Sequence, residues 1–389
     1  MEWLTDSIST LGIPLIAIAL FNAGPFEMGV LYALGYLAYP LLGLFAGVWV
    51  DRWRRKPVLV WTNITQVLAL ASIPLAYMLK ILSLYQLFLV TLIMSVTIVF
   101  FNMAYTAYLP TLIDREDLVE GNSKLEASAS VSAVVGPALA SGLFDVLGAA
   151  LSVAVDAIGT LIATIAILSI RKPEPPVPSK GEGRFWNEMR DGLRSVTATP
   201  SLRTIALVTS ILNVGNSMFY AVFLLYIVNQ LKISEAIAPI IFAVGAVGSL
   251  MGAAFAPVLL KRVGFGRSLV VALLINGIGR LLVQVSVYGS TLVLLSALWM
   301  IASIGVPIYN VNQVSFRQAI IPDELQGRMN ATMRTLGYGA ATVGAFIGGI
   351  LGSVYGIMAV MTGGATLALL PALLIHFGTF GKVTDTRQS

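Results

Sequence analysis

The sequence predicts an all-α membrane protein whose twelve transmembrane helices form two pseudo-symmetric six-helix bundles. Three observations predict this class: the composition, the number of long apolar runs, and a similarity between the two halves of the chain. Of the 389 residues, 57% are hydrophobic and only 11% are charged, whereas about 25% are charged in an average soluble protein. Because so few charges cannot cover a water-exposed surface, most of the surface must face lipid.

Twelve apolar runs recur along the chain, each about 20 residues long, which is the length that crosses a hydrocarbon core as a helix. In the first half they lie near 4–21, 28–50, 58–79, 84–107, 126–145 and 149–170. In the second half they lie near 204–229, 236–260, 267–288, 290–313, 334–354 and 357–377. The chain has no cysteine, which excludes disulfides and thiolate metal sites.

A charged, Pro-rich segment separates the two halves and is too polar to enter lipid. It divides the chain into an N-terminal bundle, 1–172, a cytoplasmic linker, 173–203, and a C-terminal bundle, 204–389. The first part of the segment is typical of an extended linker. The stretch "RFWNEMRDGLRSV" within it is expected to form a short helix along the membrane surface.

The distribution of Lys and Arg predicts the orientation. Of the 24 basic residues, Lys80 and Lys232 lie in connections on one side and Arg280 lies within a span. All the others fall in the alternate connections or beyond the last span. Cytoplasmic loops carry the Lys/Arg excess, so both termini and the linker should be cytoplasmic in a multi-pass protein of the cell membrane, plasma or inner. The outer connections are too short for a receptor ectodomain.

The two halves repeat a pattern of three residues. The same residue types follow one another at the same intervals in each half: Asn122, Gly136 and Gly148, then Asn330, Gly344 and Gly356. Two six-helix repeats are typical of transporters, which build a binding site near the bilayer midplane between them.

The stretch "GVWVDRWRRK" resembles the loop signature G-x-L-x-D-R-x-G-R-K of the major facilitator superfamily. The matching residues are Gly47, Asp51, Arg52, Arg55 and Lys56, whereas Arg54 replaces the second glycine. Residues 108–144 and 316–352 resemble the efflux branch of that family, which includes enterobactin exporters and macrolide efflux proteins. The resemblance implies the twelve-helix fold. Family members usually begin ten to twenty residues earlier, so either the first helix is short or its start is misassigned.

A proline in the fifth span also has a family counterpart. Gly136 and Pro137 resemble the core of the motif G-x-x-x-G-P-x-x-G-G of drug antiporters, and Ser132, Ala140 and Ser141 replace its glycines. Small residues permit close helix approach. This motif favours export, although ordinary packing of small residues explains it equally well.

The family fold places the second span beside the eleventh and the fifth beside the eighth. We therefore expect two ion pairs between the bundles, Asp51 with Arg334 or Arg328, and Glu126 with Lys261, which close the cytoplasmic side. The alternative is that these residues are solvated loop charges.

Ionisable groups within spans are costly and are functional candidates. Asp6 ranks first for proton coupling, because the family often has an acidic residue at this point of the first helix; the alternative is an exposed N-terminal residue. Asp156 is the second candidate. A structural role with polar neighbours such as Gln284 is the stronger expectation for Asp156 and Arg280, since their helices are usually peripheral.

Amide and aromatic side chains in three spans form the predicted substrate surface. They are Phe101, Asn102, Tyr105, Asn213, Asn216, Tyr220, Tyr309, Asn310 and Gln313. Three of them, on the seventh span, share one helical face. Interhelical hydrogen bonding is the alternative role of such a stripe.

These features predict a proton-coupled exporter of amphipathic small molecules, drug-like or siderophore-like, that works by alternating access. An importer or uniporter of a small neutral solute has the same fold and remains the alternative. An enzyme is excluded, because the chain has no nucleophile–base set and no H-E-x-x-H motif, and no phosphate-binding loop marks a primary pump. The expected partners are a small-molecule substrate, protons and the lipid bilayer, with no nucleic acid, cofactor or metal, and the chain is expected to be a monomer.

Overall fold

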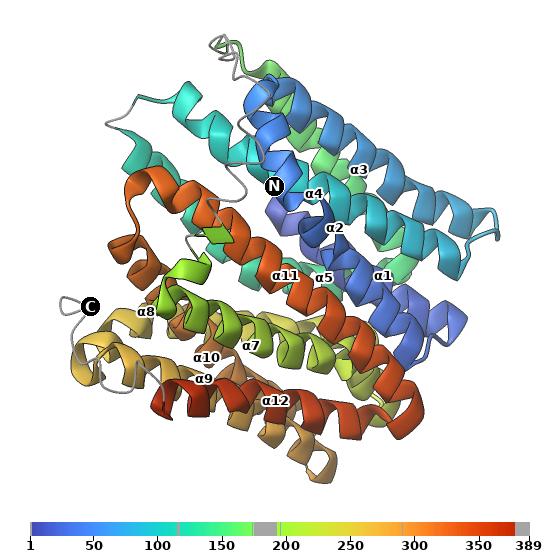
Figure 1. Ribbon diagram of the computed structural model, residues 1–389. Coiled ribbons are helices and arrows are strands. Elements are labelled where there is room, and N and C mark those ends of the chain that lie inside the picture. The colour runs from blue at the N-terminus through green and yellow to red at the C-terminus, as the bar shows by residue number, and fades with distance from the viewer. Residues whose placement is uncertain are drawn as a thin grey trace. The chain divides into compact units, whose positions relative to one another are not determined.

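The computed structural model describes residues 2–114, 117–172, 174, 193–194, 196–289 and 291–377, and all the secondary structure in these ranges is helical (Figure 1). In chain order the helices of the first half are α1 (Glu2–Phe21), α2 (Pro25–Arg52), α3 (Arg55–Met78), α4 (Leu84–Leu112) and α5 (Leu118–Ser169). Those of the second half are α7 (Pro200–Leu225), α8 (Ala238–Val263), α9 (Phe265–Val283), α10 (Thr291–Ile320), α11 (Asp323–Tyr355) and α12 (Ile357–Phe377). A π-helical turn, η3 (Tyr226–Gln230), extends α7, and a 3₁₀ turn, η4 (Gln284–Tyr288), extends α9.

The helix α5 is two helices joined at a sharp turn. It runs for 52 residues, but Gly148 inside it has φ 73° and ψ 159°, which no helix accommodates. Among the described residues, 11 helices are long and apolar enough to cross a membrane. Since the turn at Gly148 divides one of them, the prediction of twelve spans is confirmed.

Several helices extend beyond their apolar runs. The helix α11 begins at Asp323 rather than near 334, and α5 begins at Leu118 rather than near 126. Apolarity marks only the part of a helix that lies in hydrocarbon, whereas the helix itself continues into polar sequence. Arg328, which lies before the apolar run, is therefore part of α11 together with Arg334.

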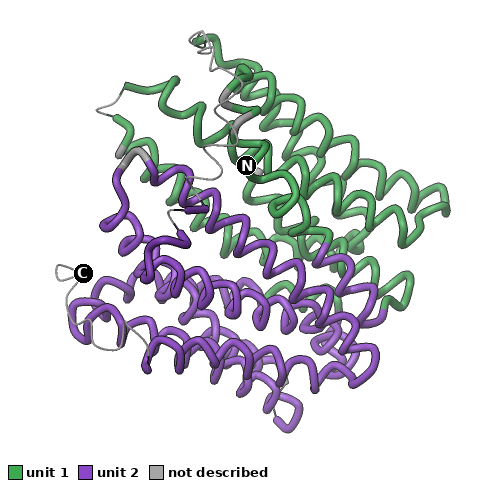
Figure 2. The backbone as a smooth tube through the Cα atoms, in the orientation of Figure 1, with its two compact units in different colours: residues 1–23, 34–187, 235–240 green, residues 24–33, 188–234, 241–389 purple. Residues whose placement is uncertain are grey.

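The chain forms two compact units, shown in green and purple in Figure 2. Unit 1 contains residues 1–23, 34–187 and 235–240, and unit 2 contains residues 24–33, 188–234 and 241–389. The domain boundaries drawn from the sequence, 1–172 and 204–389, remain a prediction, and the surface helix predicted for the linker lies largely outside the described residues.

In each half, the first and fifth helices touch through a glycine of the sequence repeat. A Cβ atom added to Gly136 of α5 would lie 2.9 Å from the carbonyl oxygen of Leu4 in α1. A Cβ atom on Gly344 of α11 would overlap the backbone of Val214 in α7. The repeat in the sequence therefore corresponds to a repeated contact between backbones.

The last glycine of the repeat has the same backbone conformation in both halves. Gly148 has φ 73° and ψ 159°, and Gly356 has φ 86° and ψ 165°. This region of conformational space is essentially restricted to glycine. Each of these residues turns the chain directly into the last helix of its half.

Each unit has its own aromatic core. In unit 1, Phe101 and Tyr108 of α4 pack with Leu59 of α3. In unit 2, the rings of Phe265 and Phe316 stack with their centroids 4.3 Å apart and join α9 to α10. These cores hold α4 and α10, two of the helices that carry predicted substrate residues.

We expect Gly344→Ala to destabilise the protein by ~1–3 kcal/mol, because its methyl group has no space against α7. Gly363→Ala in α12 is the matched control, since a Cβ atom there meets nothing within 4 Å. The control should be neutral or stabilising by up to about 1 kcal/mol, because alanine favours a helix over glycine. Thermal unfolding of the purified protein in detergent measures both changes, and equal midpoints for the two variants would contradict the proposed contact.

Candidate functional site

A short polar stretch interrupts the apolar sequence of α1 near its beginning. It presents Thr5 and Ser9 on one face, because residues four apart lie one above the other on a helix. The helix α1 packs along α5, and the second segment of α5 contributes Asp156 at this contact. All three side chains are buried, with 8%, 2% and 2% of their surface exposed, respectively.

Two aspartates lie close together across this contact between helices. The carboxyl group of Asp156 lies near the hydroxyl groups of Thr5 and Ser9, and Oγ of Ser9 forms no hydrogen bond with any described group. Asp6 is half-buried; its carboxyl group interacts with the hydroxyl of Thr10 and electrostatically with Asp156. Neither aspartate forms an ion pair with any residue that the structure describes. Among the described residues there is also no cluster of three or more side chains able to bind a metal ion.

A glycine lets the two helices approach at the aspartates. A Cβ atom on Gly159 would lie 2.5 Å from Oγ1 of Thr5, so any other residue here would push α1 away from Asp156. Gly159, Thr5 and the two aspartates therefore form one structural cluster. We call Asp6 and Asp156 the aspartate pair.

Asp156 has polar neighbours, as the sequence predicts, but they are not the amide of Gln284 given as an example. Gln284 lies in η4 of unit 2, where its Oε1 accepts a hydrogen bond of 2.8 Å from the hydroxyl of Thr362. The neighbours of Asp156 come from α1 instead. Sequence analysis treated Asp6 and Asp156 as separate candidates, because nothing in their spacing along the chain shows that α1 packs against the last part of α5.

The predicted substrate residues of α4 divide into two groups. Asn102 is half-buried and donates a hydrogen bond of 3.0 Å to the hydroxyl of Tyr39 in α2. The ring of Tyr105 meets Trp3 of α1 edge to face, with centroids 5.8 Å apart. Phe101 is only 8% exposed and packs in the core of unit 1. Asn102 and Tyr105 are therefore better placed than Phe101 to meet a ligand.

In unit 2, α7 carries the predicted amide stripe. Asn213 donates a hydrogen bond of 3.1 Å from Nδ2 to the carbonyl oxygen of Gly337 in α11. Asn216 is 8% exposed, and its Oδ1 has no hydrogen-bond partner among the described groups. One amide of the stripe thus joins helices, and the other keeps a free acceptor.

Aromatic rings surround the arginine within a span. The guanidinium carbon of Arg280 lies 4.8 Å, 4.6 Å and 5.5 Å from the ring centroids of Phe219, Tyr220 and Trp299, respectively. Arg280 is 2% exposed. Cation–π contacts stabilise a desolvated cation by about 2 kcal/mol, so the three rings help to accommodate the buried charge of Arg280. Tyr220, predicted to bind substrate, belongs to this cage.

The predicted substrate residues of α10 also lie in different environments. Tyr309 is buried, and its hydroxyl forms a hydrogen bond of 2.7 Å with Oγ1 of Thr209 in α7. Gln313 is 5% exposed, and its Oε1 has no partner in the described ranges. Asn310 is exposed, so the three residues do not share one surface.

Sequence analysis missed two buried polar residues of α10. Asn312 donates a hydrogen bond of 3.2 Å from Nδ2 to Oγ of Ser268 in α9. Arg317 is 7% exposed, and its Nε has no partner among the residues that are described. The apolar run ends near 313, so Arg317 counts as a loop charge in the sequence, whereas α10 continues to Ile320.

The family signature lies where α2 ends and α3 begins. The carboxylate of Glu174 accepts hydrogen bonds from the backbone N–H groups of Arg55 (2.6 Å) and Lys56 (3.4 Å), which are the first two residues of α3. The ammonium group of Lys56 donates to the carbonyl oxygens of Leu168 (2.9 Å) and Ile170 (2.6 Å). Glu174 therefore caps α3, and Lys56 neutralises the C-terminal end of α5.

The other predicted gating residues lie on four helices: Gly47, Asp51 and Arg52 on α2, Glu126, Gly136 and Pro137 on α5, Lys261 on α8, and Arg328 and Arg334 on α11. The side chain of Asp51 lies outside the described part of the structure. Glu126, Lys261 and Arg334 are exposed. Because the members of each expected ion pair belong to different units, both pairings remain predictions.

Comparison with known proteins decides the family. Residues 1–279 and 205–386 match the model of the Major Facilitator Superfamily. The chain belongs to the major facilitator superfamily. The predicted fold and the resemblance to the efflux branch are both confirmed, and this facilitator is a multi-pass membrane protein.

Two groups of relatives have names that refer to efflux. The facilitator is 28% identical over 177 residues to macrolide efflux protein A of Enterococcus faecalis, a match that covers 45% of this chain and 54%, about half, of that protein. It is 23% identical over 361 residues to the enterobactin exporter EntS of Escherichia coli O1:K1, a match that covers 90% of this chain and 82% of the exporter.

Solved structures share the fold at low identity. A bacterial homologue of the iron transporter ferroportin, in an inward-facing state, has a TM-score of 0.74 and 17% identity over 97% of both chains. The nucleoside transporter NupG has a TM-score of 0.73 and 14% identity over 96% of this facilitator and 98% of its own chain. Both identities are low, so the likeness shows the facilitator fold alone.

We expect Glu174→Ala to destabilise the facilitator by ~1–2 kcal/mol, because the N-terminus of α3 loses its cap. Glu120→Ala is the matched control: Glu120 forms a 2.7 Å ion pair with Lys124, but both side chains are exposed. Such a surface pair contributes less than about 1 kcal/mol. Thermal unfolding of both variants tests this, and a smaller shift for Glu174→Ala than for the control would show that the cap is unimportant.

Proposed function

We propose that this facilitator is a proton-coupled exporter of amphipathic small molecules, and that the aspartate pair couples proton movement to transport. The observation that carries the proposal is the proximity of Asp6 and Asp156 in a site with no ion-pair partner among the described residues. Two carboxylates so placed repel each other when both are ionised, and one proton removes that repulsion. Access of water to the pair therefore becomes linked to binding and release of a proton.

Alternating access would make the proton movement through the aspartate pair directional. The repeated halves suit a transporter that opens first to one side and then to the other. The expected ion pairs of Asp51 with Arg334 or Arg328, and of Glu126 with Lys261, close the cytoplasmic side while the outer side is open. Each closure biases a two-state equilibrium by about 1–3 kcal/mol.

The names of the relatives and the motif on α5 support export. Macrolide efflux protein A and enterobactin exporter are names that describe outward movement of a compound, and Gly136 with Pro137 matches the core of the antiporter motif. The cargo we propose is drug-like or siderophore-like. Half-buried amide and aromatic side chains such as Asn102 and Tyr105 suit an amphipathic molecule.

The proposal includes location and assembly. The excess of Lys and Arg in alternate connections places both termini in the cytoplasm of a cell-membrane protein. We propose a monomer, since each chain carries both halves of the transport pathway.

Transport into proteoliposomes with an imposed pH gradient tests the coupling, with erythromycin and ethidium as probes. We expect Asp6→Asn and Asp156→Asn each to reduce gradient-driven accumulation at least tenfold, because the amide cannot release a proton. Exchange of the probe without a gradient should persist, which distinguishes lost coupling from misfolding. Asp145→Asn is the control, since Asp145 lies on α5 but is exposed. Gradient-driven accumulation that is unchanged in both variants would contradict the role of the pair.

A charge exchange tests the proposed closure. Asp51→Arg should impair transport at least fivefold, since it places like charges together, and adding Arg334→Asp should restore part of the rate. The expected coupling free energy is about 1–3 kcal/mol. The initial rate of probe transport in the single and double variants measures it, and losses that simply add would exclude the pairing.

A further inference from the structure

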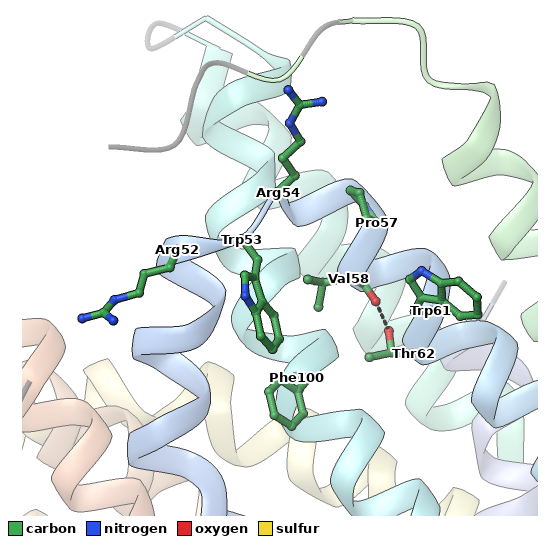
Figure 3. A pocket seen from close by; sticks show the side chains of 8 residues that line it. All are labelled: Arg52, Trp53, Arg54, Pro57, Val58, Trp61, Thr62 and Phe100. Atoms are coloured by element: carbon green, nitrogen blue, oxygen red, sulfur yellow. Dashed lines mark hydrogen bonds between the residues drawn. The ribbon is translucent and has the colours of Figure 1, made fainter. Parts of the chain in front are cut away.

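A pocket of about 750 Å³ opens at the turn between α2 and α3 (Figure 3). Its residues belong to unit 1. The rings of Trp53 and Phe100 form one wall, Trp61 lies opposite, and Pro57 and Val58 lie between them. The volume is that of a small-molecule site, yet no residue of the predicted substrate surface lines it.

The aromatic wall is built from rings stacked in parallel. Phe100 stacks on Trp49 with an interplanar angle of 5° and on Trp53 with an angle of 19°. Trp53 and Trp61 are 48% and 68% exposed. Indole rings exposed at the end of a membrane-spanning helix are typical of the boundary between lipid and water.

The basic residues of the turn differ in what they contact. Arg55 donates a hydrogen bond to Glu174, and Lys56 donates to a carbonyl oxygen at the end of α5. The guanidinium group of Arg52 points away from the rings in Figure 3. Arg54 is exposed and extends from the turn beyond the aromatic walls. The pocket thus combines a long apolar surface with a cation at its rim.

Arg54 and the rings have no role in the proposed transport cycle. Arg54 stands where the family signature has glycine, which provides neither charge nor side chain. Trp53 occupies a variable position of the signature, and Trp61 lies beyond it. Apart from Arg52, the pocket is therefore lined by residues that the signature does not specify.

We propose that this pocket binds an anionic phospholipid of the cytoplasmic leaflet. The phosphate and headgroup contact Arg54, and one acyl chain lies between Trp61 and the wall formed by Trp53 and Phe100. A free phosphate ion would leave the aromatic walls unused. A zwitterionic lipid lacks the net negative charge that complements Arg54, and none of the described lining residues is acidic and able to receive its cationic group. Basic pockets between membrane helices on the cytoplasmic side are suited to such headgroups.

Lipid binding to the purified full chain in detergent, measured by native mass spectrometry, tests the headgroup. Phosphatidylglycerol should bind more tightly than phosphatidylcholine with the same acyl chains. Arg54→Gln should weaken phosphatidylglycerol binding about fivefold, the equivalent of ~1 kcal/mol for one basic residue at an anionic headgroup. Arg267→Gln is the matched control, because Arg267 is exposed in the first turn of α9, and it should have no effect. Equal binding of the two lipids, or an Arg54→Gln variant that binds like the wild type, would overturn the proposal.

Tryptophan fluorescence tests the position of the acyl chain. Phosphatidylglycerol with brominated acyl chains should quench the wild-type protein, and Trp61→Phe and Trp53→Phe should each reduce the quenched signal. Trp299→Phe should not, because Trp299 is only 2% exposed inside unit 2. Water-soluble glycerol phosphate should fail to displace the lipid. If it competes equally well, or if quenching is unchanged in both variants, the pocket does not hold a lipid chain. Neither assay involves transport, so their outcome is independent of proton coupling.

Discussion

The contact between the first and fifth helices of each half is the constraint on which the rest of the structure depends. Gly136 brings α5 against α1, and Gly344 brings α11 against α7, at distances that no side chain permits. Within a bilayer, helices do not gain from hiding apolar surface from water, so close packing of this kind holds them together. In unit 1 the same approach, continued at Gly159, brings the two aspartates near each other. Fold and site thus share one cause.

The two halves have the same architecture but opposite chemistry. Unit 1 holds carboxyl groups, those of Asp6 and Asp156, among hydroxyls. Unit 2 holds guanidinium groups instead, Arg280 among aromatic rings and Arg317 at the end of α10. A duplicated fold can in this way carry different chemical groups in its two halves, carboxyl groups in one and guanidinium and amide groups in the other. The aromatic cage also explains how a permanent positive charge is tolerated within a span.

Sequence reasoning predicted the parts of the structure that depend on composition. Twelve spans, the repeat and the family all follow from apolar length and from residue spacing, because the bilayer allows few other arrangements. The C-terminal end of α10 and the beginning of α11 could not be predicted, because a helix that leaves the bilayer becomes polar and resembles a loop in the sequence. For the same reason the burial of Arg317 could not be predicted. The proximity of Asp6 and Asp156 depends on how α1 packs against α5, and the capping of α3 by Glu174 on a contact between distant segments. Neither contact can be inferred from the residues nearby in the sequence.

The two turns at Gly148 and Gly356 have a consequence for how such a duplicated gene can diverge. Both backbones adopt a conformation open only to a residue whose side chain is a hydrogen atom. Substitution of either glycine is therefore strongly disfavoured, whereas most exposed residues of either half can change until the similarity between the halves is lost. In a distant descendant whose halves no longer align, the pair of glycines would still mark where one ancestral copy corresponds to the other.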